Sequence, residues 1–273
     1  IKVVPRYIRP LGTTFFISGK EFIMIDNAIE EFKKYSNNYL EYGKMMTLKI
    51  NHTLRVMDLC EEIAKSLNLS EEEIYIAKII GLLHDIGRFE QYKEYKTFVD
   101  RKSIDHAELG IEILKKDNYL RKYIEDDSYD DIILDSIRYH NKFTIPDNLD
   151  KKKELFIKLI RDADKIDILY LRVIGELEVE LDDNPLNDSI YNTLINKKSI
   201  NRKDLKTKTD RLGVSLGFIF DINYKESFKI LREVKYFDQI IDIYKEKTNN
   251  EKLKEQLEEI RKVINNYIEV NLC

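Results

Sequence analysis

The chain has 273 residues, of which 43% are hydrophobic and 35% are charged, and its formal net charge is −4. A chain of this length can bury a sizeable core, and its near balance of charge excludes a general nucleic-acid binder. Only 9 glycines and 4 prolines are present, which disfavours a sheet-rich fold with many tight turns. We therefore expect a mainly helical protein.

The cysteines and the opening segment bear on location. Cys60 and Cys273 cannot form a disulfide framework, so a reducing, cytoplasmic location is expected. No run of about 18 apolar residues is present, and no membrane partner is expected. Residues 1–23 hold two of the four prolines and begin without Met. They are interpreted either as a leader foreign to the native protein, which would then start at Met24, or as a short hairpin or arm.

From residue 24 onward, apolar residues recur at helical spacing. Ser70 followed by Glu73 is a capping box, which predicts a helix start. Gly87 stands where a helix C-terminus would favour a left-handed residue. The expected helices cover residues 25–36, 54–67, 70–83, 104–117, 129–141, 152–182, 187–196, 222–247 and 250–270. No stretch predicts a strand.

Prolines and a basic stretch interrupt this helical pattern. Pro146 predicts a loop between two helices, and Pro185 is expected to close the long helix before it. Residues 197–211 hold seven Lys or Arg against two Asp. This basic stretch is either a solvated loop or a lid that faces phosphate, with Arg211 and Lys208 as its candidate ligands.

The histidines are few and regularly placed. His52, His84, His106 and His140 fall on four different expected helices or helix starts, each on the apolar face. A single histidine of this kind is commonly an ordinary core or surface residue. Burying four separate imidazoles, however, leaves many ring nitrogens in need of partners. Convergence on metal ions satisfies all four, so the pattern favours a metal site.

Carboxylates complete the candidate ligand set. Asp85 follows His84 directly, and Asp162, Asp164 and Asp167 lie within two turns of one helix, with Asp164 on its inward stripe. A buried carboxylate requires a cation, either a metal ion or a neighbouring Arg or Lys. Imidazole and carboxylate ligands together suit Fe, Mn, Co, Ni or Zn, whereas the lack of thiolates disfavours a structural zinc site.

A family resemblance rests on these residues. His52, the pair His84-Asp85 and Asp164 within Ala163-Asp164-Lys165-Ile166-Asp167 resemble the HD-domain superfamily of metal-dependent phosphohydrolases. The resemblance implies an all-α fold, with an HD-domain helical bundle over residues 24–175. Residues 176–273 are then expected to form a C-terminal helical extension that packs on this core.

The two remaining histidines resemble the extra ligands of two-metal members of the superfamily. The resemblance implies that His52, His84 and Asp164 hold one divalent transition-metal ion. It implies that His106 and His140 hold a second ion, with Asp85 bridging the two.

Two such ions can share a hydroxide, which would act as the nucleophile on a phosphate ester. Arg88, one turn after Asp85, and Lys165, next to Asp164, are the nearest cations in the sequence that could bind the phosphate. Arg88 can offer phosphate a planar fork, which Lys165 cannot. The expected catalytic residues are Asp85, Arg88 and Lys165, and the expected substrate-binding residues are Arg88, Lys165 and Arg211.

The expected activity is metal-dependent hydrolysis of a small phosphomonoester or phosphodiester, with a nucleotide as the favoured substrate. Two alternatives stay open. The same six-ligand pattern is similar to mixed-valence di-iron oxygenases of the inositol oxygenase type. The ions could also have a purely structural role and stabilise the helical bundle, while the later helices sense a ligand or partner.

Overall fold

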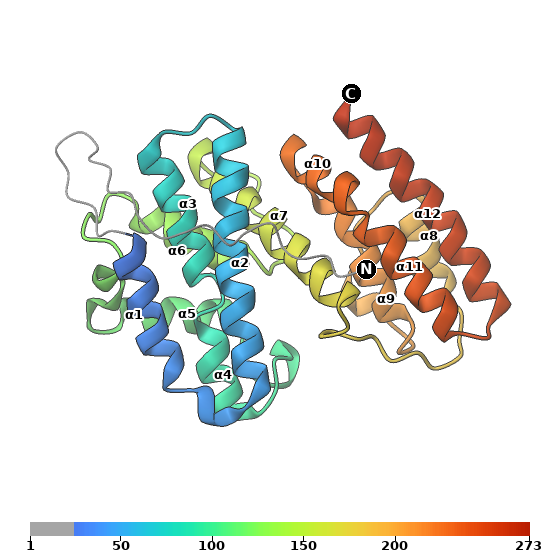
Figure 1. Ribbon diagram of the computed structural model, residues 1–273, viewed down its shortest axis with the longest axis horizontal. Helices are drawn as coiled ribbons and strands as arrows, with labels where there is room; N and C mark the ends of the chain where they lie inside the picture. The colour runs from blue at the N-terminus through green and yellow to red at the C-terminus, as the bar shows by residue number, and fades with distance from the viewer. Residues whose placement is uncertain (1–24) are drawn as a thin grey trace. The chain divides into compact units, whose positions relative to one another are not determined.

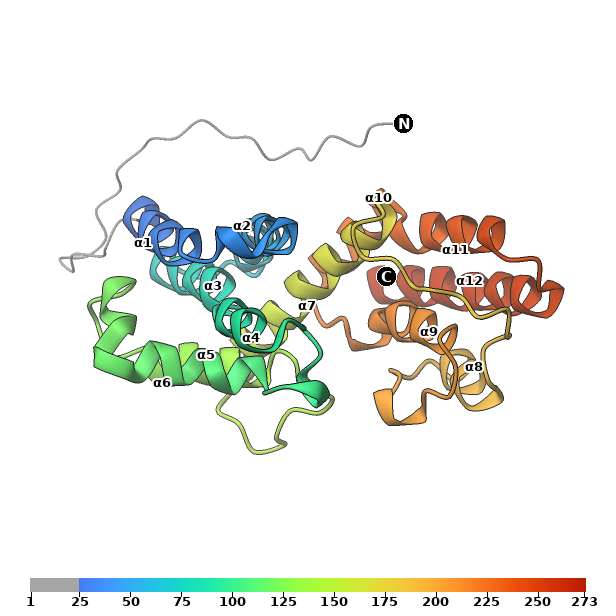
Figure 2. The same cartoon turned by 90° about the horizontal axis from the view of Figure 1, so that it is seen from below.

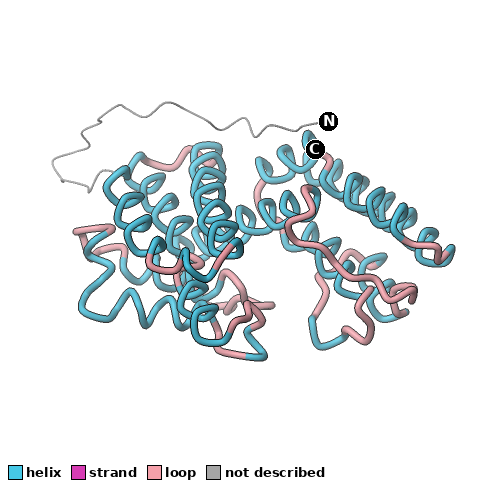
Figure 3. Tube along the Cα trace, turned by 60° about the horizontal axis from the view of Figure 1, so that its bottom comes forward, coloured by secondary structure: helices cyan, strands magenta, loops and turns pink. Residues whose placement is uncertain are grey.

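The computed structural model describes residues 25–273, and this part of the chain consists of helices and connecting loops without a strand (Figure 3). The all-α expectation is confirmed. Residues 1–23, expected as a leader or arm, lie outside the described residues. Within the described range, no helix is both long enough and apolar enough to cross a membrane.

The chain divides into two compact units. The first unit comprises the residues up to Lys142 together with Pro146–Ile160, and the second comprises Phe143–Ile145 and Arg161–Cys273. The division after Ile160 falls inside one long helix. The boundary expected at residue 175 stays a prediction.

The first unit is a bundle in which α2 packs along α3, α5 packs on both α4 and α6, and α3 contacts α1 and α6 (Figures 1 and 2). Its helices are α1 (Ile25–Asn37), α2 (Lys44–Ser66), α3 (Glu71–Leu83), α4 (Gly87–Tyr95), α5 (His106–Lys115), α6 (Asp130–Tyr139) and the start of α7 (Lys151–Val173), with 3-10 helices η1 (Leu40–Tyr42), η2 (Asp100–Lys102) and η3 (Lys116–Lys122).

Local sequence features fix how α2 and α3 pair. The expected capping box is confirmed, because the Ser70 hydroxyl accepts from the Glu73 amide and the Glu73 carboxylate accepts from the Ser70 amide. Gly81 permits a close approach of the two helices, since a Cβ there would lie 2.8 Å from the Cα of Met57. This pairing brings the middle of α2 near the end of α3.

Gly87 has a different role from the one expected. It does not adopt a left-handed conformation, and α4 begins at this residue rather than ending there. A Cβ at Gly87 would lie 2.1 Å from the carbonyl oxygen of His106 and 2.7 Å from the amide nitrogen of Gly110. The missing side chain therefore allows α4 to touch α5, and the expectation of a helix C-cap was wrong.

The second unit continues α7 and adds five helices, of which α10 and α11 pack on α12, α8 packs on α12, and α9 packs on α8. Their bounds are α8 (Asp188–Ile195), α9 (Asp210–Leu216), α10 (Lys225–Val234), α11 (Tyr236–Lys247) and α12 (Glu251–Leu272), with 3-10 helices η4 (Arg202–Asp204) and η5 (Gly217–Asp221).

Two expected helices are shorter than the apolar pattern indicated. The helix expected over 152–182 ends at Val173, because Gly175 takes a φ of +77° and the Glu176 amide turns back to the Leu171 carbonyl. The helix expected over 222–247 is two helices, broken at Lys235, which has a φ of +53°. Pro146 lies in the loop before α7, as expected.

Candidate metal centre

Four helices of the first unit each deliver one imidazole to its interior. His52 lies in α2, His84 directly follows α3, His106 begins α5, and His140 directly follows α6. All four side chains are buried, with residues no more than 4% exposed. The prediction that every histidine of the chain faces inward is confirmed.

The Nδ1 atoms of three of these rings each have, as their nearest partner, an oxygen that can only accept a hydrogen bond. His84 Nδ1 lies 2.7 Å from the Gly81 carbonyl oxygen, and His140 Nδ1 lies 2.7 Å from the Ile137 carbonyl oxygen. His106 Nδ1 lies 2.8 Å from a carboxylate oxygen of Asp100. Each Nδ1 must therefore carry the proton, which leaves a bare lone pair on Nε2 in the neutral rings.

These Nε2 atoms meet in two pairs. In the first pair, His52 Nε2 lies 3.3 Å from His84 Nε2, and in the second pair, His106 Nε2 lies 3.1 Å from His140 Nε2. In the second pair both rings carry their proton on Nδ1, so the two Nε2 lone pairs face each other and repel, unless a cation or a proton lies between them. Nitrogen donors fixed in this tautomer are the form in which histidine binds a metal ion, so the residues fit such ions.

Asp85 stands between the two pairs. Its Oδ2 lies 3.6 Å from the Nε2 of both His52 and His84, whereas its Oδ1 lies 3.2 Å from His106 Nε2 and 3.7 Å from His140 Nε2. One carboxylate oxygen thus faces each pair. Each pair together with Asp85 forms a buried group that could hold one ion.

Asp85 is charged in this setting. Burial alone would raise the pKa of its carboxyl, but the Lys49 ammonium and the surrounding imidazoles hold that pKa well below its usual range. Lys49 Nζ lies 2.5 Å from Asp85 Oδ2. Sequence reasoning missed Lys49, although it precedes His52 by three residues and so shares its face of α2.

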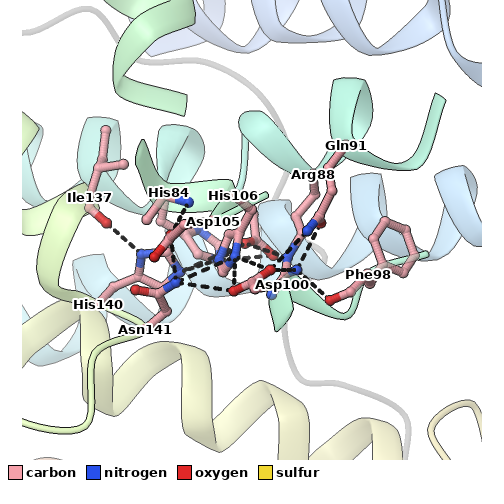
Figure 4. A network of polar contacts seen from close by, with 12 residues as sticks. His84, Arg88, Gln91, Phe98, Asp100, Asp105, His106, Ile137, His140 and Asn141 are labelled. Atoms are coloured by element: carbon pink, nitrogen blue, oxygen red, sulfur yellow. Dashed lines mark hydrogen bonds and ion pairs between the residues drawn. The ribbon is translucent and has the colours of Figure 1, made fainter. Parts of the chain in front are cut away.

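Arg88 lies one turn beyond Asp85, at the start of α4, and joins a polar network beside the second pair (Figure 4). Its Nη1 donates to Gln91 Oε1 at 2.9 Å, to the Phe98 carbonyl at 2.6 Å and to Asp100 Oδ1 at 2.8 Å. Its buried Nε has no hydrogen-bond partner among the described residues and lies 3.4 Å from Asp85 Oδ1. The guanidinium is therefore anchored through one nitrogen at the edge of the metal centre.

Sequence reasoning also missed three members of this network, which are Gln91, Asp100 and Asn141. They come from α4, from η2 and from the residue after His140, and no periodic pattern marks them. Asp100, Asp105 and His106 form a third group with ligand atoms close together. There, however, Asp105 accepts from Lys142, Asn141 and the Ala107 amide, so its oxygens are already engaged.

The acids of α7 lie in the part of that helix that belongs to the second unit. Asp162 and Asp167 are buried, while Asp164, expected on the inward stripe, is part-exposed. Asp162 accepts from the backbone amides of Asn223 and Tyr224, and burial raises the pKa of Asp162 to about 6. The role of Asp164 as a metal ligand stays a prediction.

The remaining cations expected at the substrate also lie in the second unit. Lys165 is buried, with its ammonium 2.8 Å from Asp221 Oδ2, and burial lowers the pKa of Lys165. Arg211 is exposed at the start of α9, and Lys208 pairs with Glu180. Substrate roles for Lys165 and Arg211 stay predictions.

The fold and the site define a class: an all-helical protein that holds a buried carboxylate between two histidine pairs, a donor set suited to divalent transition-metal ions. Residues 50–169 match the family model for the HD domain. This part of the chain is therefore an HD domain, the mark of a family of metal-dependent phosphohydrolases, and the resemblance seen in its motifs is confirmed. Comparison with curated proteins and with solved structures gave no match.

Proposed function

We propose that this chain hydrolyses a small phosphomonoester or phosphodiester, with a nucleotide as the favoured substrate, in a reaction that requires two divalent ions. The observation that carries the proposal is the placement of Asp85, which turns one oxygen to each histidine pair. The second pair with Asp85 would hold one ion, and the first pair with Asp85 the other. When bound, such ions supply Lewis acidity that activates water and offsets phosphoryl charge.

Arg88 is proposed to bind a phosphoryl oxygen of the substrate. Among residues 25–273, its hydrogen bonds all come from Nη1 and its buried Nε lies against Asp85, so Nη2 is left for a ligand. A guanidinium makes charge-assisted hydrogen bonds to phosphate, and one anchored nitrogen reduces the side-chain freedom lost on binding. Lys49, which also contacts Asp85, adds a second positive charge at the same edge of the centre.

A pair of aromatic rings next to these cations favours a nucleotide over a simple phosphate ester. The part-exposed Phe98 ring has its centroid 4.7 Å from that of Tyr92, 5.7 Å from Lys49 Nζ and 5.9 Å from Arg88 Cζ. An aromatic surface beside phosphate-binding cations can stack on a base, and such stacking contributes about 1–3 kcal/mol per base.

The test is release of phosphate or nucleoside from a panel of nucleotides, dinucleotides and model phosphate esters, each assayed with Fe, Mn, Co and Ni. Activity that depends on metal is expected, and Asp85→Asn should abolish it. Silence across the panel, with metal shown to be bound, would contradict the proposal. Oxygen consumption specific to iron would instead indicate a di-iron oxygenase.

Arg88→Ala tests the assignment of the phosphate-binding cation. It should lower kcat/KM by about 100-fold, as loss of one charge-stabilising donor does. Metal content should not change, because Arg88 is not a ligand. Arg211→Ala serves as the comparison, since that exposed residue was a weaker expectation for the same role.

A further inference from the structure

Asp100, in η2, contacts two parts of the centre that lie in different helices. Its Oδ2 and Oδ1 lie 2.8 Å and 3.0 Å from His106 Nδ1, and its Oδ1 also accepts from Arg88 Nη1 at 2.8 Å. Gln91 Nε2 donates to the same Oδ1 at 2.8 Å. Asp100 therefore joins an imidazole of the second pair to the guanidinium of Arg88 (Figure 4).

His106 is held differently from its neighbours in the centre. The Nδ1 atoms of His84 and His140 donate to backbone carbonyls, whereas His106 Nδ1 donates to a carboxylate side chain. A carboxylate fixes the ring and the tautomer, and it also makes the other ring nitrogen a stronger donor to a metal ion. The second pair thus depends on a side chain that substitution can remove.

Asp100 is surrounded by donors, because Arg88 Nη1 and Gln91 Nε2 both donate to its Oδ1 while His106 Nδ1 faces its Oδ2. A side chain that only accepts, and that lies against a guanidinium, acts as a carboxylate. Its hydrogen bond to His106 is therefore of the stronger, charge-assisted kind.

We propose that Asp100 is a positioning residue, which holds His106 in the tautomer that binds metal and at the same time sets the orientation of Arg88. The part that concerns His106 and metal depends only on the donor geometry. The part that concerns Arg88 rests on the proposed function, because it requires a phosphate ester as substrate.

Asp100→Asn is the test. Its amide group can donate to His106 Nδ1, which shifts the ring proton to Nε2 and removes the lone pair that would bind metal. Titration of the metal-free protein with Mn²⁺ should show binding at the second pair weakened by about 10- to 100-fold, with binding at the first pair unchanged. This readout does not require activity, so its failure is distinguishable from failure of the proposed function.

Asp105→Asn is the matched control. It removes one negative charge from the same network, which shares Asn141 with Asp100, and it keeps a good N-cap for α5. Among the described residues, Asp105 makes its hydrogen bonds to Lys142, Asn141 and the Ala107 amide and none to the His106 ring, so both Mn²⁺ affinities should stay at the wild-type value. Equal weakening in both variants would overturn the proposal, because it would show an effect of charge alone.

Retention of wild-type affinity at both pairs in Asp100→Asn would also overturn it. Should that variant fail to fold, Asp100→Glu replaces it, since it keeps the charge but moves the carboxylate by one methylene. The same weakening at the second pair is then expected. Substrate assays on the folded variant should show a higher KM as well, because Arg88 loses the charged one of the three acceptors that anchor it.

Discussion

The Nε2 atoms of His106 and His140 lie 3.1 Å apart in the interior of the first unit, with both Nδ1 atoms engaged by acceptors. Two lone pairs at this distance destabilise the folded chain, and a cation between them removes the repulsion. The geometry therefore links metal binding to stability, in the same way as any ligand that binds only the folded state.

We accordingly expect divalent ions to raise the melting temperature of the metal-free protein. At 100 times the dissociation constant, a bound ion contributes about 2.7 kcal/mol, which for a chain of this size corresponds to about 5–10 °C. Thermal melts with EDTA and then with Mn²⁺, Fe²⁺, Co²⁺ or Ni²⁺ measure the shift. If none of these ions moved the melting temperature, the centre would not be a metal site.

Removal of one imidazole should remove one ion. His106→Ala is expected to reduce the bound metal from about two ions to about one per chain. It should also lower turnover by more than about 100-fold, which is the loss typical when a residue that only hydrogen-bonds a metal ligand is replaced. Elemental analysis and phosphate release measure the two effects. His52→Ala should lose the complementary ion. Loss of turnover with a nearly unchanged melting temperature would exclude a purely structural role for the metals.

The histidine set was predictable because helical periodicity alone places each imidazole on an apolar face, and burial of four such rings calls for a shared partner. Asp100 was not predictable in this way. Its contact with His106 depends on the path of the loop after α4, and loops carry no period. Lys49 could have been found, since it lies one turn before His52.

Helix ends show the same limit. Gly175 is a recognisable stop signal, whereas Lys235 takes a left-handed conformation that its residue type does not indicate. Gly87 was misinterpreted because two different settings favour glycine. A helix end favours it for its left-handed backbone, whereas a close contact between helices favours it because there is no room for a Cβ. Only the position of α5 distinguishes the two cases.

That contact between α4 and α5 predicts the effect of Gly87→Ala. The new Cβ would meet the His106 carbonyl and the Gly110 amide, both backbone groups, so the helices must separate. We expect a loss of about 3 kcal/mol in the free energy of unfolding, and weaker metal binding because His106 moves. Gly110→Ala is the control. There the nearest atom is a side-chain methyl of Ile86 at 3.3 Å, and at most about 1 kcal/mol should be lost. Equal losses would contradict this account.

The hydrogen bonds of Asp182 should make the free energy of unfolding of the second unit depend on pH. Its carboxylate accepts from the Thr209 hydroxyl at 2.6 Å and from the Lys208 amide at 2.9 Å, and these bonds outweigh desolvation and lower the pKa of Asp182 to about 2. Because the folded pKa lies below the ordinary value of 3.8, the stabilisation is present above pH 4 and is lost as the pH falls from 4 towards 2.

Asp182→Ala should therefore be less stable than the wild type at pH 7, by about 1 kcal/mol because solvent screens this part-exposed group. The difference should shrink as the pH falls below 4. Urea unfolding of both proteins between pH 7 and pH 3 measures it, with Glu180→Ala as the control, since that exposed carboxylate pairs only with Lys208 among the described residues. A difference that stayed constant down to pH 3 would show that Asp182 stabilises the fold by packing rather than by its charge.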